Sequence, residues 1–412
     1  MGIANAVGTI LGEPPGVRLE AFDGSTSGSP EAPITIEIRN QRALNYLATA
    51  AGSLGLARAY VSGDLDVRGD LYEALTGLSD LSFDRSWAGR LRALRELGGL
   101  KLLNRPPVPP MEVKLRGRRH SKERDQAAIS HHYDVSNKFY SWILGPSMAY
   151  TCAVYPTETA TLEEAQYAKH DLVARKLGLE PGMRLLDVGC GWGGMVLHAA
   201  KHYGVRVIGV TLSRRQAEWG QKAIAEAGLT DLAEIRHLDY RDVPEDQFDA
   251  ISSIGLTEHI GRAQLPKYFQ HLHDRLRPGG RLLNHCITRP NNLEPAVRKR
   301  QFINRYIFPD GELHGVGHLV SQMHDIGFEV RHEENLREHY AMTLHAWSGN
   351  LDRHWEEAVE EVGRPRARTW RLYLAGCQVG FERNDIQLHQ VLGVKLTADH
   401  KSLMPLRPTW AG

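Results

Sequence analysis

The sequence predicts an α/β protein whose core is a parallel-rich, Rossmann-like sheet, and three observations support this class. Between residues 184 and 287, apolar segments of strand length alternate with segments of helical length. The first apolar segment runs directly into a glycine-rich loop, and a helical segment follows that loop. Strands that alternate with helices at this interval predict a parallel sheet with helices on both faces. Ligands bind such sheets outside the carboxyl ends of the strands.

Each element of this sheet follows from the local sequence. The expected strands are short apolar runs at residues 184–188, 205–210, 233–238, 248–254 and 281–287. The helices expected between them occupy residues 195–202, 213–227 and 265–276. The last of these helices ends at Arg277-Pro-Gly-Gly280, because proline and glycine terminate helices.

The rest of the chain suggests three parts. Residues 1–104 are expected to form a small N-terminal α+β domain, with a strand at 34–39 and a helix at 43–56. Residues 105–127 are proline-rich and then basic, which indicates a stiff linker. Its basic residues are either a solvated connector or a patch that attracts anionic lipid headgroups. Residues 128–412 then form the catalytic domain, in which helices expected at about 342–362 and 366–382 interrupt the alternation.

Composition excludes several classes of protein. The 50 lysines and arginines balance 49 acidic residues, so no net field favours nucleic acid. The four cysteines are scattered without a C-x-x-C pair, which argues against a metal site and fits a reducing cytoplasm. No apolar run approaches the roughly 18 residues that span a bilayer, and the start lacks the features of a secretory signal. Any membrane contact is therefore expected to be peripheral.

The glycine-rich loop indicates the type of ligand. The segment Arg184–Gly194 ends in Asp-Val-Gly-Cys-Gly-Trp-Gly-Gly, with an acidic residue two positions before the first glycine. A dinucleotide fingerprint reads G-x-G-x-x-G, whereas this spacing is closer to the D-x-G-x-G pattern of S-adenosylmethionine (SAM) methyltransferases. Glycine has no Cβ, so a ligand can approach the backbone closely. The loop therefore favours SAM.

Residues that can carry chemistry follow several expected strands. Thr211, Leu212 and Gln216 follow the second strand, where many nucleotide-binding sheets carry an acidic residue. Asp239 and Tyr240 follow the third, and this aspartate is expected to bind the adenine amino group unless it only forms a turn. Glu258 follows the fourth strand, and His285 lies near the end of the fifth. Because neighbouring strand ends meet, we expect a carboxylate and an imidazole suited to general-base chemistry or to holding a small oxyanion.

These residues belong to a larger set of motifs that resembles the cyclopropane-fatty-acyl-phospholipid synthase family. The similarity covers about residues 128 to 395, and the order and spacing of its motifs agree throughout. The motifs are Tyr150-Thr-Cys-Ala, Asp187–Gly194, Gly209–Ser213, Asp239–Asp242, Glu258–Gly261, Asn304–Pro309, Tyr340 with Thr343–Trp347, and Arg383–Gln387. The N-terminal segment is similar to the extension of bacterial members that act on phospholipids.

The resemblance implies a class I SAM-methyltransferase fold with helical insertions and a transfer from SAM to the cis double bond of unsaturated acyl chains in membrane phospholipids. It also implies that bicarbonate acts as the base and is held by Cys152, Glu258, His285, the backbone of Ile287, and Tyr340. The implied SAM contacts are Tyr150, Thr151, Asp187, Gly189, Gly191, Thr211, Leu212, Gln216, Asp239 and Tyr240. Two departures from the family pattern are Thr151 in place of serine and Leu256-Thr257 in place of bulkier residues.

Several alternatives stay open at this point. The carbocation left by methyl transfer leads either to a cyclopropane ring or, after a hydride shift, to a methylene-branched chain. A methyltransferase for a soluble metabolite and a catalytically silent SAM- or lipid-binding protein are competing interpretations. The resemblance implies a cytoplasmic enzyme at the inner face of the cell membrane, and a homodimer is one candidate assembly.

Overall fold

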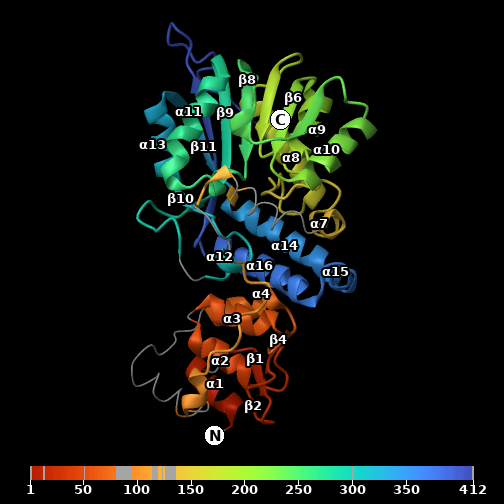
Figure 1. Cartoon of the computed structure of the whole chain (residues 1–412), viewed down its shortest axis with the longest axis vertical. Coiled ribbons are helices and arrows are strands. Elements are labelled where there is room, and N and C mark those ends of the chain that lie inside the picture. Colours follow the sequence, from red (N-terminus) through yellow and green to blue (C-terminus); the bar gives the residue numbers. More distant parts are fainter. Residues whose placement is uncertain are drawn as a thin grey trace. The chain divides into compact units, whose positions relative to one another are not determined.

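The computed structural model describes residues 2–12, 14–50, 52–79, 95, 97, 99–113, 119–122, 124–125, 136–298 and 301–410 (Figure 1). Much of the expected basic linker and residues 128–135 therefore lie outside the described part. The chain forms two compact units. Unit 1 comprises Met1–Lys114, Arg298–Pro309 and Leu351–Val379, and unit 2 comprises Leu115–Val297, Asp310–Asn350 and Gly380–Gly412.

Unit 2 contains the expected parallel-rich sheet. Its strand order is β11-β12-β9-β8-β5-β6-β7, and β10 pairs beside β9. The five strands β9, β8, β5, β6 and β7 pair in parallel, whereas β12 is antiparallel to both β9 and β11. The strands are β5 (Arg184–Val188), β6 (Arg206–Thr211), β7 (Ala233–His237), β8 (Phe248–Ile254), β9 (Leu276–Arg289), β10 (His314–Gly315), β11 (Phe328–Asn335) and β12 (Gln387–Lys395).

Helices cover both faces of this sheet, as the sequence predicts (Figure 1). Alternate side chains of a strand point to opposite faces, so Leu185 and Leu186 of β5 belong to different cores. The core on one face includes residues of α8 (Leu162–Leu177), α9 (Gly194–Tyr203) and α10 (Arg214–Glu226). The core on the other face includes residues of α11 (Leu265–Arg275) and α13 (Val316–Ile326). The described part of this unit also includes α7 (Asn137–Leu144) and most of α14 (Arg337–Arg353).

Unit 1 contains a four-stranded sheet of order β2-β1-β3-β4, with helices around it. Its strands are β1 (Val17–Ala21), β2 (Thr26–Ser27), β3 (Ile34–Ile38) and β4 (Leu65–Arg68). Its described α-helices are α1 (Ile3–Leu11), α2 (Gln41–Thr49), α3 (Ser53–Val61), α4 (Leu71–Ser79), α12 (Phe302–Tyr306), α15 (Trp355–Val362) and most of α16 (Arg364–Glu382).

The compact units differ from the expected domains because two later segments pack with the N-terminal one. Arg368 of α16 is buried, and its guanidinium donates to the carbonyls of Tyr60 and Leu65 at 2.6 and 2.8 Å. It also bonds Asp66 at 2.9 Å and lies 3.9 Å from the centre of the Tyr60 ring. No local pattern in the sequence predicts these contacts, which span about three hundred residues.

Three details differ from the expected elements. The helix expected at 43–56 is two helices, because Gly52 has a φ of 64° that a continuous helix does not allow. The helix expected at 342–362 breaks at His354, between α14 and α15. Strands β11 and β12 were not expected, and β9 extends to Arg289 because it pairs with β12 and β10. Among the described residues, no helix is long and apolar enough to cross a membrane.

Candidate active site

A pocket opens at the carboxyl ends of β5, β6, β7 and β8 in unit 2, which is where a sheet of this type binds ligands. Every residue that we expect to contact SAM lines this pocket, from Tyr150 and Thr151 to Asp239 and Tyr240. Gln216 lies in the first turn of α10, as expected, and its Oε1 accepts a 2.7 Å hydrogen bond from the Thr211 hydroxyl. The structure therefore gathers the expected cofactor residues at one place.

The glycine-rich loop has the geometry that its sequence predicts. Gly189, Gly191 and Gly193 have φ values of 74°, 56° and 90°, a region that other residues rarely adopt. The amides of Gly189 and Cys190 both donate to the Val210 carbonyl, at 2.9 and 3.0 Å, and so hold the loop against β6. A Cβ on Gly193 would lie 2.5 Å from the Ile235 side chain. The loop thus presents backbone to the pocket and leads into the N-terminus of α9.

Asp187 and Asp239 both line the pocket, but their carboxyl groups differ in electrostatic state. Burial raises the pKa of Asp187 to about 6, and its Oδ1 accepts a 2.7 Å bond from Ser252. For Asp239 burial also acts to raise the pKa, but hydrogen bonds from Arg241 outweigh it and lower the pKa. Arg241 contributes its amide and Nε to Oδ1 and its Nη2 to Oδ2, at 2.9, 2.8 and 2.6 Å. A carboxylate accepts about four hydrogen bonds, so one position remains for the adenine amino group that we expect there.

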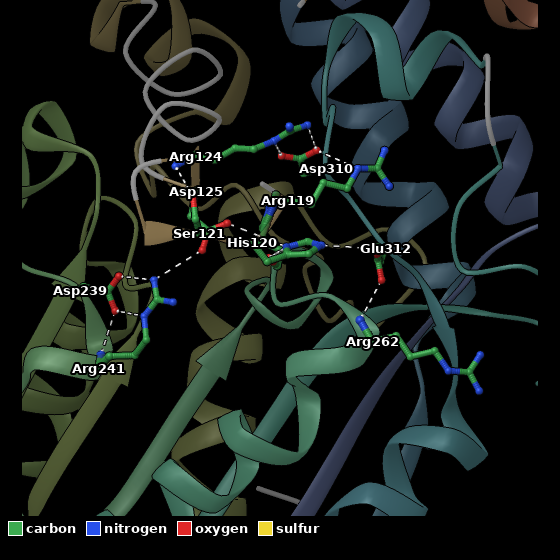
Figure 2. A network of polar contacts seen from close by, with 11 residues as sticks. Arg119, His120, Ser121, Arg124, Asp125, Asp239, Arg241, Arg262, Asp310 and Glu312 are labelled. Atoms are coloured by element: carbon green, nitrogen blue, oxygen red, sulfur yellow. Dashed lines mark hydrogen bonds and ion pairs between the residues drawn. The ribbon is translucent and has the colours of Figure 1, made fainter. Parts of the chain in front are cut away.

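A polar network borders this pocket, and the sequence alone did not predict it (Figure 2). Arg241 reaches from Asp239 to Asp125, which also lines the pocket, at 3.4 Å. Arg124 forms a bidentate pair with Asp310 at 2.5 and 2.7 Å. His120 contacts the His259 carbonyl at 3.1 Å and the Glu312 carboxylate at 3.3 Å. The network therefore connects residues 119–122, Arg124 and Asp125 to the pocket wall and to Asp310 and Glu312.

Glu258 and Ile287, two residues of the expected base site, are in direct contact. Glu258 lies in the 3-10 turn Thr257–His259 after β8, and its Oε1 accepts a 2.7 Å hydrogen bond from the Ile287 amide of β9. Its Oε2 is buried and has no hydrogen-bond partner among the described residues. Burial raises the pKa of Glu258 to about 7. The carboxyl group is therefore poised to change its protonation state near neutral pH.

His285 lies two residues before Ile287 on β9 and is also buried. Its Nδ1 contacts the Gln390 amide at 3.2 Å, whereas its Nε2 has no partner among the described residues. Burial, reinforced by the charges of Lys169 and Lys176, holds the pKa of His285 well below its usual value. The ring is therefore neutral. Its carbonyl accepts a 2.8 Å bond from Gly255, a residue of the pocket lining.

Hydrogen bonds through Leu336 connect Cys152 and Tyr340 to the β12–β9 strand pair that contains Ile287. The Leu336 carbonyl accepts from the Cys152 thiol at 3.7 Å and from the Tyr340 amide at 3.1 Å. The Leu336 amide donates to Leu388, which is paired with Ile287 in the β12–β9 register. Burial raises the pKa of the Cys152 thiol, so it stays protonated. The five residues of the expected base site thus lie on adjoining segments, beside the pocket rather than among its lining residues.

Sequence reasoning missed Lys169 and His170 of α8, which line the pocket and are buried. Lys169 Nζ donates to the Thr151 hydroxyl at 3.0 Å and lies 2.9 Å from His170 Nε2. Burial lowers the pKa of Lys169 to about 8. A signal was present, because polar residues recur at core-facing positions of this amphipathic helix (Gln166, Lys169 and Lys176).

Comparisons with known proteins agree with the fold. The solved structures that resemble this chain include the cyclopropane synthase MmaA2 from Mycobacterium tuberculosis, with a TM-score of 0.62 and 35% identity over 65% of this chain and 98% of that one. The mycolic acid cyclopropane synthase CmaA1, solved with S-adenosylhomocysteine and CTAB, has a TM-score of 0.61 and 34% identity over 65% of this chain and 97% of that one. Fold and pocket therefore define a class I SAM-dependent methyltransferase.

Sequence comparison identifies the family. The model of the mycolic acid cyclopropane synthetase family matches residues 120–391, and the chain belongs to this family. It is 54% identical over 414 residues to a probable fatty acid methyltransferase of Mycobacterium tuberculosis, covering 98% of this chain and 96% of that protein. It is 32% identical over 365 residues to the cyclopropane-fatty-acyl-phospholipid synthase of Escherichia coli, covering 88% of each.

Proposed function

We propose that this methyltransferase transfers the methyl carbon of SAM to the cis double bond of an unsaturated acyl chain in a membrane phospholipid and forms a cyclopropane ring. One observation carries the proposal. Two buried polar atoms, Glu258 Oε2 and His285 Nε2, lack partners among the described residues and belong to adjoining segments beside the SAM pocket. Buried polar atoms are rarely left unpaired in a folded protein unless they serve a ligand or the chemistry.

The residues around the pocket fit SAM. The open backbone of Gly189 and Gly191 allows close approach, and Gln216 and Asp239 offer hydrogen-bonding groups from neighbouring strand ends. When bound, SAM supplies an electrophilic methyl group. An isolated alkene is a weak nucleophile, so the task of the protein is to align the double bond with this methyl group and to exclude water.

The base site fits bicarbonate by its hydrogen-bonding types. An ionised Glu258 Oε2 needs a hydrogen-bond donor, and His285 Nε2, on the β9 segment whose Ile287 amide binds Glu258 Oε1, also lacks a partner among the described residues. Bicarbonate carries one hydroxyl and two acceptor oxygens, and Cys152 and Tyr340 complete the set that would hold it. When bound, it supplies a base for the proton that must leave the alkylated chain. Because its pKa is lowered, His285 is neutral and contributes a hydrogen-bonding group to the site without a charge.

The surroundings suit an apolar chain and a cationic intermediate. Tyr340 is buried, and its ring centre lies 4.5 Å from that of Phe381 and 6.1 Å from that of Trp347. Aromatic faces stabilise a nearby cation. The solved CmaA1 complex contains CTAB, a detergent with one long alkyl chain, which supports an acyl substrate for this family member. Such a substrate in a phospholipid brings the protein to the membrane surface peripherally.

A methylene-branched acyl chain is the second candidate product. A hydride shift first moves the cation to the carbon that bears the new methyl group, and loss of a proton from that methyl then gives an exocyclic methylene. This candidate is favoured by the higher identity to a probable fatty acid methyltransferase, 54%, than to the E. coli cyclopropane synthase, 32%. Both products need the same SAM pocket and the same base.

Transfer from SAM with a deuterated methyl group to vesicles of oleoyl phospholipid tests the proposal. We expect labelled acyl chains that retain two of the three deuterons for either product, and NMR of the product separates ring from methylene. Glu258→Gln should weaken the hold on the bound base and reduce label incorporation by up to about 10²- to 10⁴-fold, the usual contribution of general-base catalysis. Glu226→Gln, an exposed change on α10, should leave the rate unchanged. Full activity of Glu258→Gln would contradict the proposed base site. Labelling of a soluble metabolite in place of the acyl chain would contradict the proposed substrate.

A further inference from the structure

A chain of three buried polar side chains in unit 2 ends at His285. Lys176, Gln390 and His285 are 0%, 0% and 1% exposed. Lys176 Nζ donates to Gln390 Oε1 at 2.8 Å, and Gln390 Nε2 lies 3.2 Å from His285 Nδ1. Lys176 is the penultimate residue of α8, and Gln390 is the direct cross-strand partner of His285 in the β12–β9 register.

The chemistry of these groups determines which atom carries each proton. An ammonium group only donates, so the Gln390 oxygen must face Lys176 and its NH₂ group must face His285. An NH₂ group only donates, so His285 Nδ1 must accept and cannot carry a proton. Lys176 is itself held by an ion pair with Glu334. Its position therefore sets the orientation of the Gln390 amide.

A neutral imidazole has one ring proton, and in His285 that proton is then on Nε2. This nitrogen is the buried atom of His285 that has no partner among the described residues. Burial and the nearby charges of Lys169 and Lys176 keep the ring neutral. His285 Nε2 is consequently a hydrogen-bond donor, whereas Glu258 Oε2 is an acceptor when the carboxyl group is ionised.

We propose that Gln390, oriented by Lys176, is a positioning residue that fixes His285 as its Nε2–H tautomer, so that His285 offers a donor to the anion that Glu258 helps to hold. This inference rests on the proposed function. Three wholly buried polar side chains are not needed to stabilise a sheet, because apolar residues of similar size often do so as well or better. A donor at His285 explains why they are there.

The substitution Gln390→Glu reverses the hydrogen-bonding type with little change of shape. A carboxylate still accepts from Lys176, but toward His285 it only accepts, so the ring proton must move to Nδ1. Long-range ¹H–¹⁵N spectra of histidine-labelled protein without ligand report which ring nitrogen carries the proton. The His285 signals are identified by their absence in His285→Gln. Gln221→Glu, which keeps its acceptor for the Ile235 amide, is the matched control.

We expect the wild-type protein and Gln221→Glu to show a protonated Nε2, and Gln390→Glu to show a protonated Nδ1. Lys176→Met removes the donor that orients the Gln390 amide, so the amide can flip and His285 should show both tautomers. This variant tests the inference if Gln390→Glu does not fold. A protonated Nδ1 in the wild-type protein, or an unchanged tautomer in both variants, would overturn it.

Activity gives a second readout. Gln390→Glu should lower kcat by about 10- to 100-fold, the range typical for groups that orient a ligand-binding histidine. KM for SAM should stay within about twofold, because the SAM pocket is unchanged. A loss of SAM affinity that accompanies the loss of rate would indicate a structural role and count against the inference. If the wild-type protein labels no acyl chain, the proposed function fails while the tautomer result still stands.

Discussion

At the scale of single residues, the site depends on a carboxyl group that is costly to bury. Glu258 has one oxygen bound to the Ile287 amide and one without a partner among the described residues, and burial raises its pKa to about 7. An ionised carboxylate in such surroundings destabilises the folded state. Active sites commonly retain such groups at the expense of stability.

We therefore expect Glu258→Gln to stabilise the ligand-free protein, and the gain should depend on pH. Below the unfolded pKa of 4.5 the wild-type carboxyl is protonated in both states, so the two proteins should be similar. Between pH 4.5 and 7 the unfolded state releases this proton and the folded state keeps it, so wild-type stability falls as pH rises. Above pH 7 the variant should be more stable by about 2–4 kcal/mol. Urea unfolding at pH 5 and 8 measures the difference, and an equal stability at both pH values would contradict it.

At the scale of elements, the position of α10 against the glycine-rich loop sets the shape of the pocket. Gly220 of α10 faces this loop, and a Cβ there would lie 3.0 Å from the Trp192 carbonyl and 2.5 Å from Ile235 Cδ1. Gln216 and the loop glycines therefore depend on a close contact between helix and backbone that only glycine allows.

Gly220→Ala should push α10 away from the loop, lower stability by about 1–3 kcal/mol and raise KM for SAM. Gly376→Ala is a matched control, because nothing lies within 4 Å of the added Cβ in α16. There alanine favours the helix over glycine, so stability should rise by about 0.5–1 kcal/mol. Thermal unfolding and SAM titration distinguish the two variants, and an unchanged KM in Gly220→Ala would show that the helix adapts.

At the scale of the whole molecule, the chain enters unit 2 at Leu115 and again at Asp310. The network in Figure 2 joins these two passages, through Arg124–Asp310 and His120–Glu312. The His120 ring also lies against Gly261, where an added Cβ would be 2.4 Å away. The rim of the SAM pocket is thus held by segments far apart in sequence.

This network predicts a pH-dependent contribution from His120. Its hydrogen bond with Glu312 raises the pKa of His120 above 6.5, so its stabilisation is complete below pH 6.5 and is lost as pH rises through the raised pKa. His120→Gln should therefore destabilise the protein more at pH 6 than at pH 9 in urea unfolding. Lys122→Gln, which breaks an exposed pair with Asp242, should cost less than about 1 kcal/mol at either pH. A larger effect of His120→Gln at pH 9 would be inconsistent with this pairing.

Local patterns predicted much of the fold but not its antiparallel edge. Strands 184–188 and 248–254 have the expected bounds, because a short apolar run between turns identifies a buried strand. Strand β11 contains Glu329, Arg331 and several other polar residues, so its sequence does not suggest a strand. It forms because β12 offers a partner about sixty residues away. Pairing between distant segments decided this part.

The sequence by itself determined the positions of the parallel strands along the chain, the glycine-rich loop and the residues at the strand ends, because each depends on neighbours within a few positions. Only the tertiary structure decided that Glu258 binds the Ile287 amide and that Gln390 contacts His285. It also decided that Arg241 fills most of the hydrogen-bonding positions of the Asp239 carboxylate. It also decided which segments form unit 1. These outcomes depend on burial and on partners far along the chain, since a buried polar atom takes its state from whatever group packing brings to it.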